Sequence, residues 1–222
     1  IDEGNIQIPD KQEIGVVLSE TGFSEFFTVS DIISILKCTY KRFDEDLFHS
    51  YCQRFDIPLD KKTRTFSTGM KAKLNIIIAL THHAKLLILD EPTAGLDVLT
   101  RDEILDILRD YMEQEDCTIL ISSHISSDLE SLCDDLYVID HGQIIMHEEM
   151  DTLLSQYGVL KVSKEDYDNL DKDYLLKVMK EPFGYSCLTN VRQFYSENYP
   201  TIVIEQNHID TMIPILLKGE RL

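Results

Sequence analysis

Polar side chains directly follow two short apolar runs of this sequence. Residues 86–89 (Leu-Leu-Ile-Leu) are followed by Asp90 and Glu91, and residues 118–121 are followed by Ser-Ser-His at 122–124. The carboxyl ends of neighbouring parallel strands share one edge of a sheet, and ligands bind outside that edge. If both runs are strands of one sheet, two carboxylates and a histidine meet there. Such side chains can together hold a metal ion, a water molecule and an anion.

The three ionisable side chains suit different tasks. Asp90, at the end of its strand, is placed to hold Mg²⁺ directly or through water. Glu91 points elsewhere and could orient or deprotonate an attacking water, and His124 could donate a hydrogen bond to a terminal phosphate. Each residue alone is a common surface feature. Their combination, with Pro92 following and Asp97 beyond, favours a functional site.

The elements that would position these residues alternate between strand and helix. Ser67 has the chemistry of a helix N-cap, and four consecutive aliphatic residues at 86–89 are typical of a central parallel strand covered on both faces. The pattern therefore predicts an α/β fold with a parallel sheet. The expected strands are 14–18, 86–89, 118–121, 136–139 and 143–146, and the expected helices are 28–55, 68–80, 100–112 and 125–133.

The sequence changes character after about Tyr157. Short apolar runs at 159–162 and 201–205, with polar helices expected between them, predict a small separate α/β appendage over residues 158–222. No internal repeat or low-complexity segment interrupts either part.

Charge and cysteine usage narrow the class of protein. The formal net charge is −19, and residues 110–160 contain no Lys or Arg, which argues against a nucleic-acid partner and is typical of a solvated acidic face. The five cysteines are scattered, and the N-terminus lacks a signal peptide, so we expect reduced thiols and a cytosolic protein. His82 and His83 are expected in a solvated loop rather than a metal site.

In this order and spacing the motifs resemble those of the ABC ATPase family. Residues 86–91 are similar to the Walker B strand with its catalytic glutamate, 94–97 (Ala-Gly-Leu-Asp) to the D-loop, and 122–124 to the switch-histidine loop. Residues 66–70 (Phe-Ser-Thr-Gly-Met) resemble the signature motif, usually written LSGGQ. The resemblance covers roughly residues 14–150. It implies a P-loop NTPase-like parallel-sheet core over residues 1–157, with a helical subdomain inserted at about 28–80.

The resemblance also assigns roles to individual residues. It implies ATP and Mg²⁺ as cofactors, with nucleotide contacts from Asp97 and from Ser67, Thr68 and Gly69, the last three acting on nucleotide held by the other subunit of a dimer. A helix N-terminus with Ser67 and Gly69 suits this task, because it offers N–H groups and a positive dipole to a phosphate. The family's Q-loop glutamine position falls on Ser19.

One family motif has no counterpart in these residues. The sequence contains no Gly-x-x-x-x-Gly-Lys-Ser/Thr loop, the Walker A motif that grips the phosphates, and residues 1–8 resemble the segment that follows it. We therefore expect the front of the domain to be missing from this chain and the chain alone to be inactive. A naturally degenerate protein remains the alternative.

The resemblance implies an ATPase that powers a membrane transporter. The Lys-rich continuation at 71–74 resembles bacterial exporters that pair with ABC-2-type membrane subunits. The implied partners are a membrane-spanning permease subunit and a second ATP-binding subunit, with the protein lying on the inner face of the cell membrane. Two alternatives stay open, namely a soluble ABC-type ATPase acting on ribosomes or DNA, and a non-hydrolysing regulatory subunit.

Overall fold

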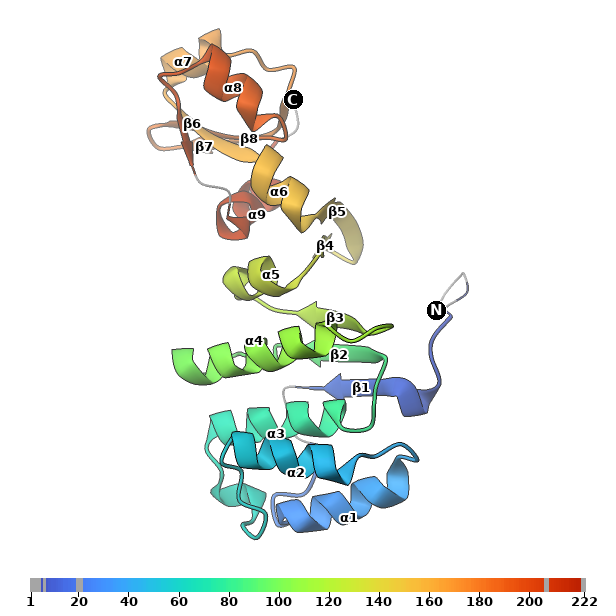
Figure 1. Ribbon diagram of the computed structural model, residues 1–222. Helices are drawn as coiled ribbons and strands as arrows, with labels where there is room; N and C mark the ends of the chain where they lie inside the picture. Colours follow the sequence, from blue (N-terminus) through green and yellow to red (C-terminus); the bar gives the residue numbers. More distant parts are fainter. Residues whose placement is uncertain (1–4, 6, 19–21, 206–207, 221–222) are drawn as a thin grey trace. The chain divides into compact units, whose positions relative to one another are not determined.

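The computed structural model describes residues 5, 7–18, 22–205 and 208–220, and it divides into two units, Ile1–His124 and Ile125–Leu222. Each unit is described by itself below. Figure 1 shows the first unit in blue to green and the second in yellow to red.

The first unit contains a three-stranded parallel sheet. Strands β1 (Ile14–Val17), β2 (Leu86–Asp90) and β3 (Thr118–Ser122) lie in the order β1-β2-β3, which confirms the predicted parallel sheet and the central place of β2. Leu87 and Leu89 are buried on one face of the sheet, whereas Val16 and Leu120 are 51% and 61% exposed on the other. On β2 itself, Leu86 and Ile88 of this second face are partly buried, so cover on both faces of β2 stays a prediction.

Two helices pack against the covered face and the ends of this sheet. Helix α3 (Thr68–Leu80) lies directly on β1, because a Cβ placed on Gly15 would stand 2.6 Å from the carbonyl oxygen of Ala79. Helix α4 (Val98–Met112) buries one apolar side, and the hydroxyl of Tyr111 donates to the carbonyl of Ala84 over 2.7 Å. The predicted helices at 68–80 and 100–112 are confirmed.

The segment predicted as one helix over 28–55 forms two. Helix α1 (Val29–Thr39) begins with a capping box between Thr28 and Asp31, and helix α2 (Glu45–Arg54) begins at Asp44, whose carboxylate accepts the Leu47 N–H over 2.8 Å. The N–H of Asp44 also donates to the carbonyl of Thr81 over 2.7 Å. This contact fixes the new start of α2 beside the end of α3.

His82 is buried, which corrects the expectation of a solvated His-His loop. Its ring is 1% exposed, stacks on Tyr40 at 4.0 Å, and places its two nitrogens 3.2 Å from the carbonyls of Ile78 and Ile14. Burial lowers the pKa of His82, so the neutral form is favoured in the folded protein. The residue therefore joins the end of α3 to the start of β1.

The second unit combines a hairpin with a four-stranded antiparallel sheet. Strands β4 (Asp135–Asp140) and β5 (Gln143–Glu149) form the hairpin, which confirms the strands expected at 136–139 and 143–146. The larger sheet has the order β7-β8-β6-β9, in which β7 (Leu175–Glu181) and β8 (Gly184–Thr189) occupy a region expected to contain only helices. The remaining elements are α5 (Ser126–Leu132), α6 (Met150–Gln156), β6 (Gly158–Val162), α7 (Lys164–Asn169), α8 (Arg192–Asn198), β9 (Val203–Glu205) and α9 (Ile209–Lys218).

One hydrophobic core crosses the position where the sequence changes character. Leu136, Leu153 and Tyr157 pack in the same cluster as Leu188 and Ile215. Residues 125–157 therefore share a core with residues that follow them, and the unit boundary lies after His124 rather than after 157. Assignment of residues 1–157 to one family domain stays a prediction.

Candidate functional site

The ends of β2 and β3 bring together the polar residues that the sequence singled out. Asp90 and Ser122 are paired in register, and the Ser122 hydroxyl donates to the Asp90 carboxylate over 2.6 Å. Both residues are exposed to solvent. The sheet thus presents a carboxylate that is held in place on one side and open to a ligand on the other.

The chain turns sharply at Glu91. Its backbone has a φ of 50°, in the left-handed region that non-glycine residues rarely adopt, and its N–H donates to the Ser122 carbonyl over 3.0 Å. A second turn contact runs from the Ala94 N–H to the Glu91 carbonyl over 3.2 Å. Such a conformation costs on the order of 1–3 kcal/mol and persists where its surroundings fix it.

Glu91 and His124 contact each other directly. His124 Nδ1 lies 2.6 Å from Glu91 Oε2, with the two side chains 69% and 31% exposed. A histidine in this place can fix the carboxylate and still reach a ligand with its second ring nitrogen. The sequence prediction that both side chains meet at one sheet edge agrees with this geometry.

The donor atoms at Asp90 suit a metal ion that arrives with a ligand. No group of three or more His, Cys, Asp or Glu side chains that could hold a metal occurs within the part of the chain that the structure describes. Mg²⁺ in nucleotide sites typically takes one or two protein oxygens and completes its shell with phosphates and water. The Asp90 carboxylate and the Ser122 hydroxyl provide such a partial set.

The start of α3 packs tightly against the start of α4. Ser67 is the N-cap of α3 and accepts the Met70 N–H over 3.2 Å. A Cβ on Gly69 would stand 2.9 Å from the Thr100 methyl carbon. Thr100 itself cannot move freely, because its N–H and hydroxyl both donate to Asp97, over 3.1 and 2.8 Å. Close packing is therefore one physical reason for glycine at position 69.

Asp97 is the N-cap of α4 as well as a predicted nucleotide contact. The hydrogen bonds from the Thr100 N–H and hydroxyl lower the pKa of Asp97. The Asp97 carboxylate holds Thr100, and Thr100 in turn lies beside Gly69 at the start of α3.

A hollow of about 530 Å³ connects the two groups of predicted residues. Glu91 lines it from the strand end and Thr68 lines it from the start of α3. Asp90, His124, Ser67, Gly69 and Asp97 are not among its lining residues. The full lining comprises Val17, Leu18, Phe23, Ser24, Glu25, Thr68, Lys71, Ala72, Asn75, Glu91, Pro92, Ala94 and Leu96.

Sequence reasoning missed an ion pair beside this hollow. Lys71 Nζ lies 2.6 Å from Glu25, and this contact lowers the pKa of the Glu25 carboxyl. Thr68, Lys71, Ala72 and Asn75 follow the i, i+3, i+4, i+7 spacing of one helix face. That spacing could have identified the four residues that α3 contributes to the lining of this hollow. Nothing local in the sequence pointed to Glu25. Ser19, the predicted Q-loop position, lies outside the described residues.

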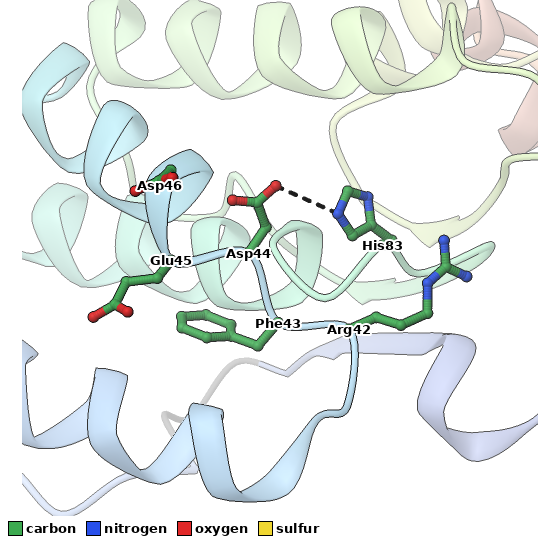
Figure 2. Close-up of a pocket in the computed structure, with 6 residues that line it drawn as sticks. All are labelled: Arg42, Phe43, Asp44, Glu45, Asp46 and His83. Atoms are coloured by element: carbon green, nitrogen blue, oxygen red, sulfur yellow. Dashed lines mark ion pairs between the residues drawn. The ribbon is translucent and has the colours of Figure 1, made fainter.

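A second hollow, shown in Figure 2, contains no predicted site residue. Its volume is about 520 Å³, and Figure 2 shows His83 facing Asp44 at the start of α2, while the Arg42 side chain extends away from it. His83 Nε2 lies 3.5 Å from the carboxylate of Asp44, which is already engaged as the α2 cap. We assign this hollow a structural role, since its acidic side chains are used to begin a helix.

Comparison with known proteins finds similarity to ABC transporter ATP-binding proteins. Residues 2–94 match the family model described as ABC transporter. The chain is 29% identical over 160 residues to the ABC transporter ATP-binding protein YtrB of Bacillus subtilis, covering 72% of this chain and 55% of that protein. It is 46% identical over 94 residues to the lantibiotic transport ATP-binding protein SrtF of Streptococcus pyogenes, covering 42% of this chain and 41% of SrtF.

The fold comparison agrees. A solved structure described as the ATP binding subunit of an ABC transporter matches with a TM-score of 0.57 at 23% identity, covering 66% of this chain and 62% of that chain. At this identity the match shows a shared mixed α/β fold. The chain spans about half the length of the curated relatives that it matches, 55% of YtrB for example. No helix among the described residues has both the length and the apolar character needed to cross a bilayer.

Proposed function

We propose that this chain is part of an ATP-binding and ATP-hydrolysing subunit that powers an ABC-type membrane transporter. The observation that carries the proposal is the pairing at the strand ends, where Asp90 meets Ser122 and Glu91 meets His124, each over 2.6 Å. The similarity to ABC transporter ATP-binding proteins gives this geometry its chemical meaning. A membrane-spanning permease subunit and a second ATP-binding subunit are the proposed partners, at the inner face of the cell membrane.

The residues at the strand ends divide the proposed reaction between them. Asp90 would hold Mg²⁺, directly or through water, beside the Ser122 hydroxyl. When bound, Mg²⁺ supplies positive charge that neutralises phosphate oxygens. Glu91 orients the attacking water and accepts its proton, and His124 fixes the Glu91 carboxylate and donates to the terminal phosphate. The two carboxylates have different partners, since Asp90 accepts from the Ser122 hydroxyl and Glu91 contacts His124.

We propose that Ser67, Thr68 and Gly69 act on nucleotide held by the second subunit. Ser67 and Thr68 are exposed at the start of α3, where another chain could reach them. Asp97 stands at the start of α4 next to them, in contact with Thr100. Because one relative is named for lantibiotic transport, an exported compound is the proposed cargo.

Paired substitutions at the strand ends test the catalytic division. In the complete subunit, Glu91→Gln should keep MgATP binding and lower hydrolysis by about 10²–10⁴-fold, because the shape is kept and the base is lost. Asp90→Asn should weaken binding of ATP in the presence of Mg²⁺ but not in its absence. Binding of a fluorescent ATP analogue and phosphate release separate the two. The division is wrong if both variants lose the same property.

A mixed dimer tests action in trans. Gly69→Asp adds bulk and negative charge where the partner's nucleotide is expected, so the homodimer should be inactive. Mixing it with a subunit lacking only the lysine of its phosphate-binding loop leaves one composite site intact. The heterodimer, purified from that mixture, should then show about half of the activity. If the mixture stays inactive, crosslinking of ATP to Ser67 decides whether the contact in trans exists.

ATP binding and hydrolysis by the purified 222-residue chain test the role of the phosphate-binding loop. Its 222 residues contain no Gly-x-x-x-x-Gly-Lys-Ser/Thr run, so the backbone cradle for the phosphates has no counterpart in them. We expect weak ATP binding and negligible hydrolysis from the purified 222-residue chain. Turnover close to that of a complete ABC subunit would contradict both this expectation and the assigned site.

A further inference from the structure

A basic hollow lies in front of helix α3 in the first unit. Its volume is about 410 Å³, and Lys61, Lys62 and Arg64 stand around an apolar lining. None of its lining residues is acidic, although the whole chain carries a net charge of −19. The lining comprises Pro58, Lys61, Lys62, Arg64, Thr65, Phe66 and Met70.

The loop that carries the three cations is held firmly. The Thr63 N–H donates to the carbonyl of Phe27, and the Arg64 N–H donates to the carbonyl of Glu25, both over 3.0 Å. The hydroxyl of Thr65 closes the loop by donating to the Lys62 carbonyl over 2.8 Å. A pre-ordered loop lowers the entropy lost when a ligand binds. These contacts favour a binding surface over a loosely solvated loop.

The positive charges are not neutralised locally. Within the residues that the structure describes, no carboxylate forms an ion pair with Lys61, Lys62 or Arg64. The nearby Asp31 accepts from the hydroxyl and the N–H of Thr28, and these hydrogen bonds lower its pKa more than Lys62 does.

An exposed aromatic ring extends the basic surface. The Arg64 guanidinium lies 5.5 Å from the centre of the Phe26 ring, and Phe26 itself is 65% exposed. An exposed aromatic side chain held under an arginine is a common feature of protein interfaces. The surface therefore offers both charge and apolar contact area.

We propose that this basic hollow binds a short acidic segment of a protein partner, with an apolar side chain of that segment placed against Phe66 and Met70. Carboxylates on either side would pair with Lys61, Lys62 and Arg64. Charge complementarity supports this occupant, because the three cations form a compact group in a strongly acidic chain. A concave, partly apolar lining fits a peptide side chain better than the flat surface of a lipid bilayer.

The surface is separate from the strand-end chemistry. Phe66 ends the basic loop and Ser67 begins α3, but Asp90, Glu91 and His124 are absent from this lining. Peptide binding should therefore need neither nucleotide nor Glu91. Glu91→Gln should leave it unchanged, so a failure of the ATPase proposal and a failure of this one can be told apart.

The test uses the full 222-residue chain and a fluorescein-labelled peptide, Glu-Asp-Leu-Phe-Glu-Asp. Fluorescence anisotropy should show saturable binding that weakens as salt is raised from low to physiological strength. The combined variant Lys61→Glu, Lys62→Glu, Arg64→Glu should weaken binding at least about tenfold, because attraction becomes repulsion. Phe66 is nearly buried, so Met70→Ala tests the apolar contact with less risk to the fold.

A matched control carries the same change in net charge at exposed lysines elsewhere, Lys41→Glu, Lys164→Glu and Lys180→Glu. Circular dichroism confirms that both triple variants are folded. The proposal is overturned if the control weakens binding equally, or if a Lys-Lys-Leu-Phe-Lys-Lys peptide binds as well. It is also overturned if phosphatidylserine vesicles bind through the same three residues while the acidic peptide does not, or if the peptide binds nowhere.

Discussion

The two units differ in how completely their sheets are covered. In the second unit, Val159 and Leu160 are neighbours on β6, point to opposite faces, and are buried to 1% and 0% exposure in two different cores. In the first unit, Leu87 is fully buried on one face, while Leu120 is 61% exposed on the other. The second unit therefore buries both faces of its sheet with its own residues, whereas large apolar side chains of the first unit's sheet are exposed on one face.

The two units also differ in whether their polar side chains are engaged within the fold or exposed. In the second unit, Asp210 and Glu130 are engaged within the fold, since Asp210 accepts the Ser126 hydroxyl and Glu130 accepts the Ile209 N–H. In the first unit, Asp90 and His124 remain exposed at the sheet edge. This difference supports the proposal that the catalytic side chains lie in the first unit. The substitutions described below test this difference between the two units.

The largest effect is expected at the exposed histidine of the first unit. In the complete subunit, His124→Ala should lower ATP hydrolysis by about 10²–10³-fold, the usual loss when one donor to a developing charge is removed. Thermal stability should stay unchanged, because the side chain is 69% exposed. His141→Ala, at a 95% exposed histidine of the second unit, is the control and should alter neither property.

The next effect concerns equal truncations in the two sheets. Leu160→Ala should lower the free energy of unfolding by about 2–5 kcal/mol, because it leaves a cavity in a closed core. Leu120→Ala, in the first unit, should change it by less than about 0.5 kcal/mol, because that side chain is already largely in water. Urea titration measures both. Equal losses would show that the open face of β3 is covered in solution.

A smaller loss of stability is expected at Gly69. Gly69→Ala should cost about 1–3 kcal/mol, because the new carbon would stand 2.9 Å from the Thr100 methyl. Adding Thr100→Ser removes that methyl and should recover part of the loss. Gly22→Ala is the control, since nothing lies within 4 Å of a Cβ at that position. If both substitutions lower the free energy of unfolding equally, the loss comes from the backbone conformation of glycine and not from the contact with Thr100.

The smallest effect is a pH dependence at Asp97. Its folded-state pKa is below the ordinary value of 3.8, so its contribution to stability is full above pH 3.8 and is lost as the pH falls through the lower native value. Asp97→Asn keeps a cap and should leave the thermal midpoint at pH 7 almost unchanged. It should flatten the decline in midpoint below pH 3.8. An unchanged decline would assign the acid sensitivity to other carboxylates.

The sequence predicted the elements with strong local signals. The strands at 86–89 and 118–121 have uninterrupted aliphatic runs, and α3 has both a capping Ser67 and no breaker. The split between α1 and α2 was missed because residues 40–44 contain neither Gly nor Pro. The hydrogen bond from the Asp44 N–H to Thr81, which fixes the break, depends on tertiary structure.

In the candidate site, too, contacts that depend on tertiary structure could not be predicted from the sequence. Asp90, Glu91 and His124 could be placed together because parallel strands end at one edge. Glu25 could not, because its contact with Lys71 joins segments 46 residues apart. Strands β7 and β8 were missed as well, since lysines interrupt the apolar pattern of the first and small or polar residues that of the second.

The contact between Gly69 and Thr100 also limits which substitutions can accumulate at these positions during evolution. A side chain at position 69 meets Thr100, and Thr100 is fixed by the Asp97 carboxylate. Substitutions at these three positions should therefore depend on one another. Among homologous chains, we expect alanine or serine at position 69 to occur together with serine or glycine at position 100, and threonine at 100 to occur with glycine at 69.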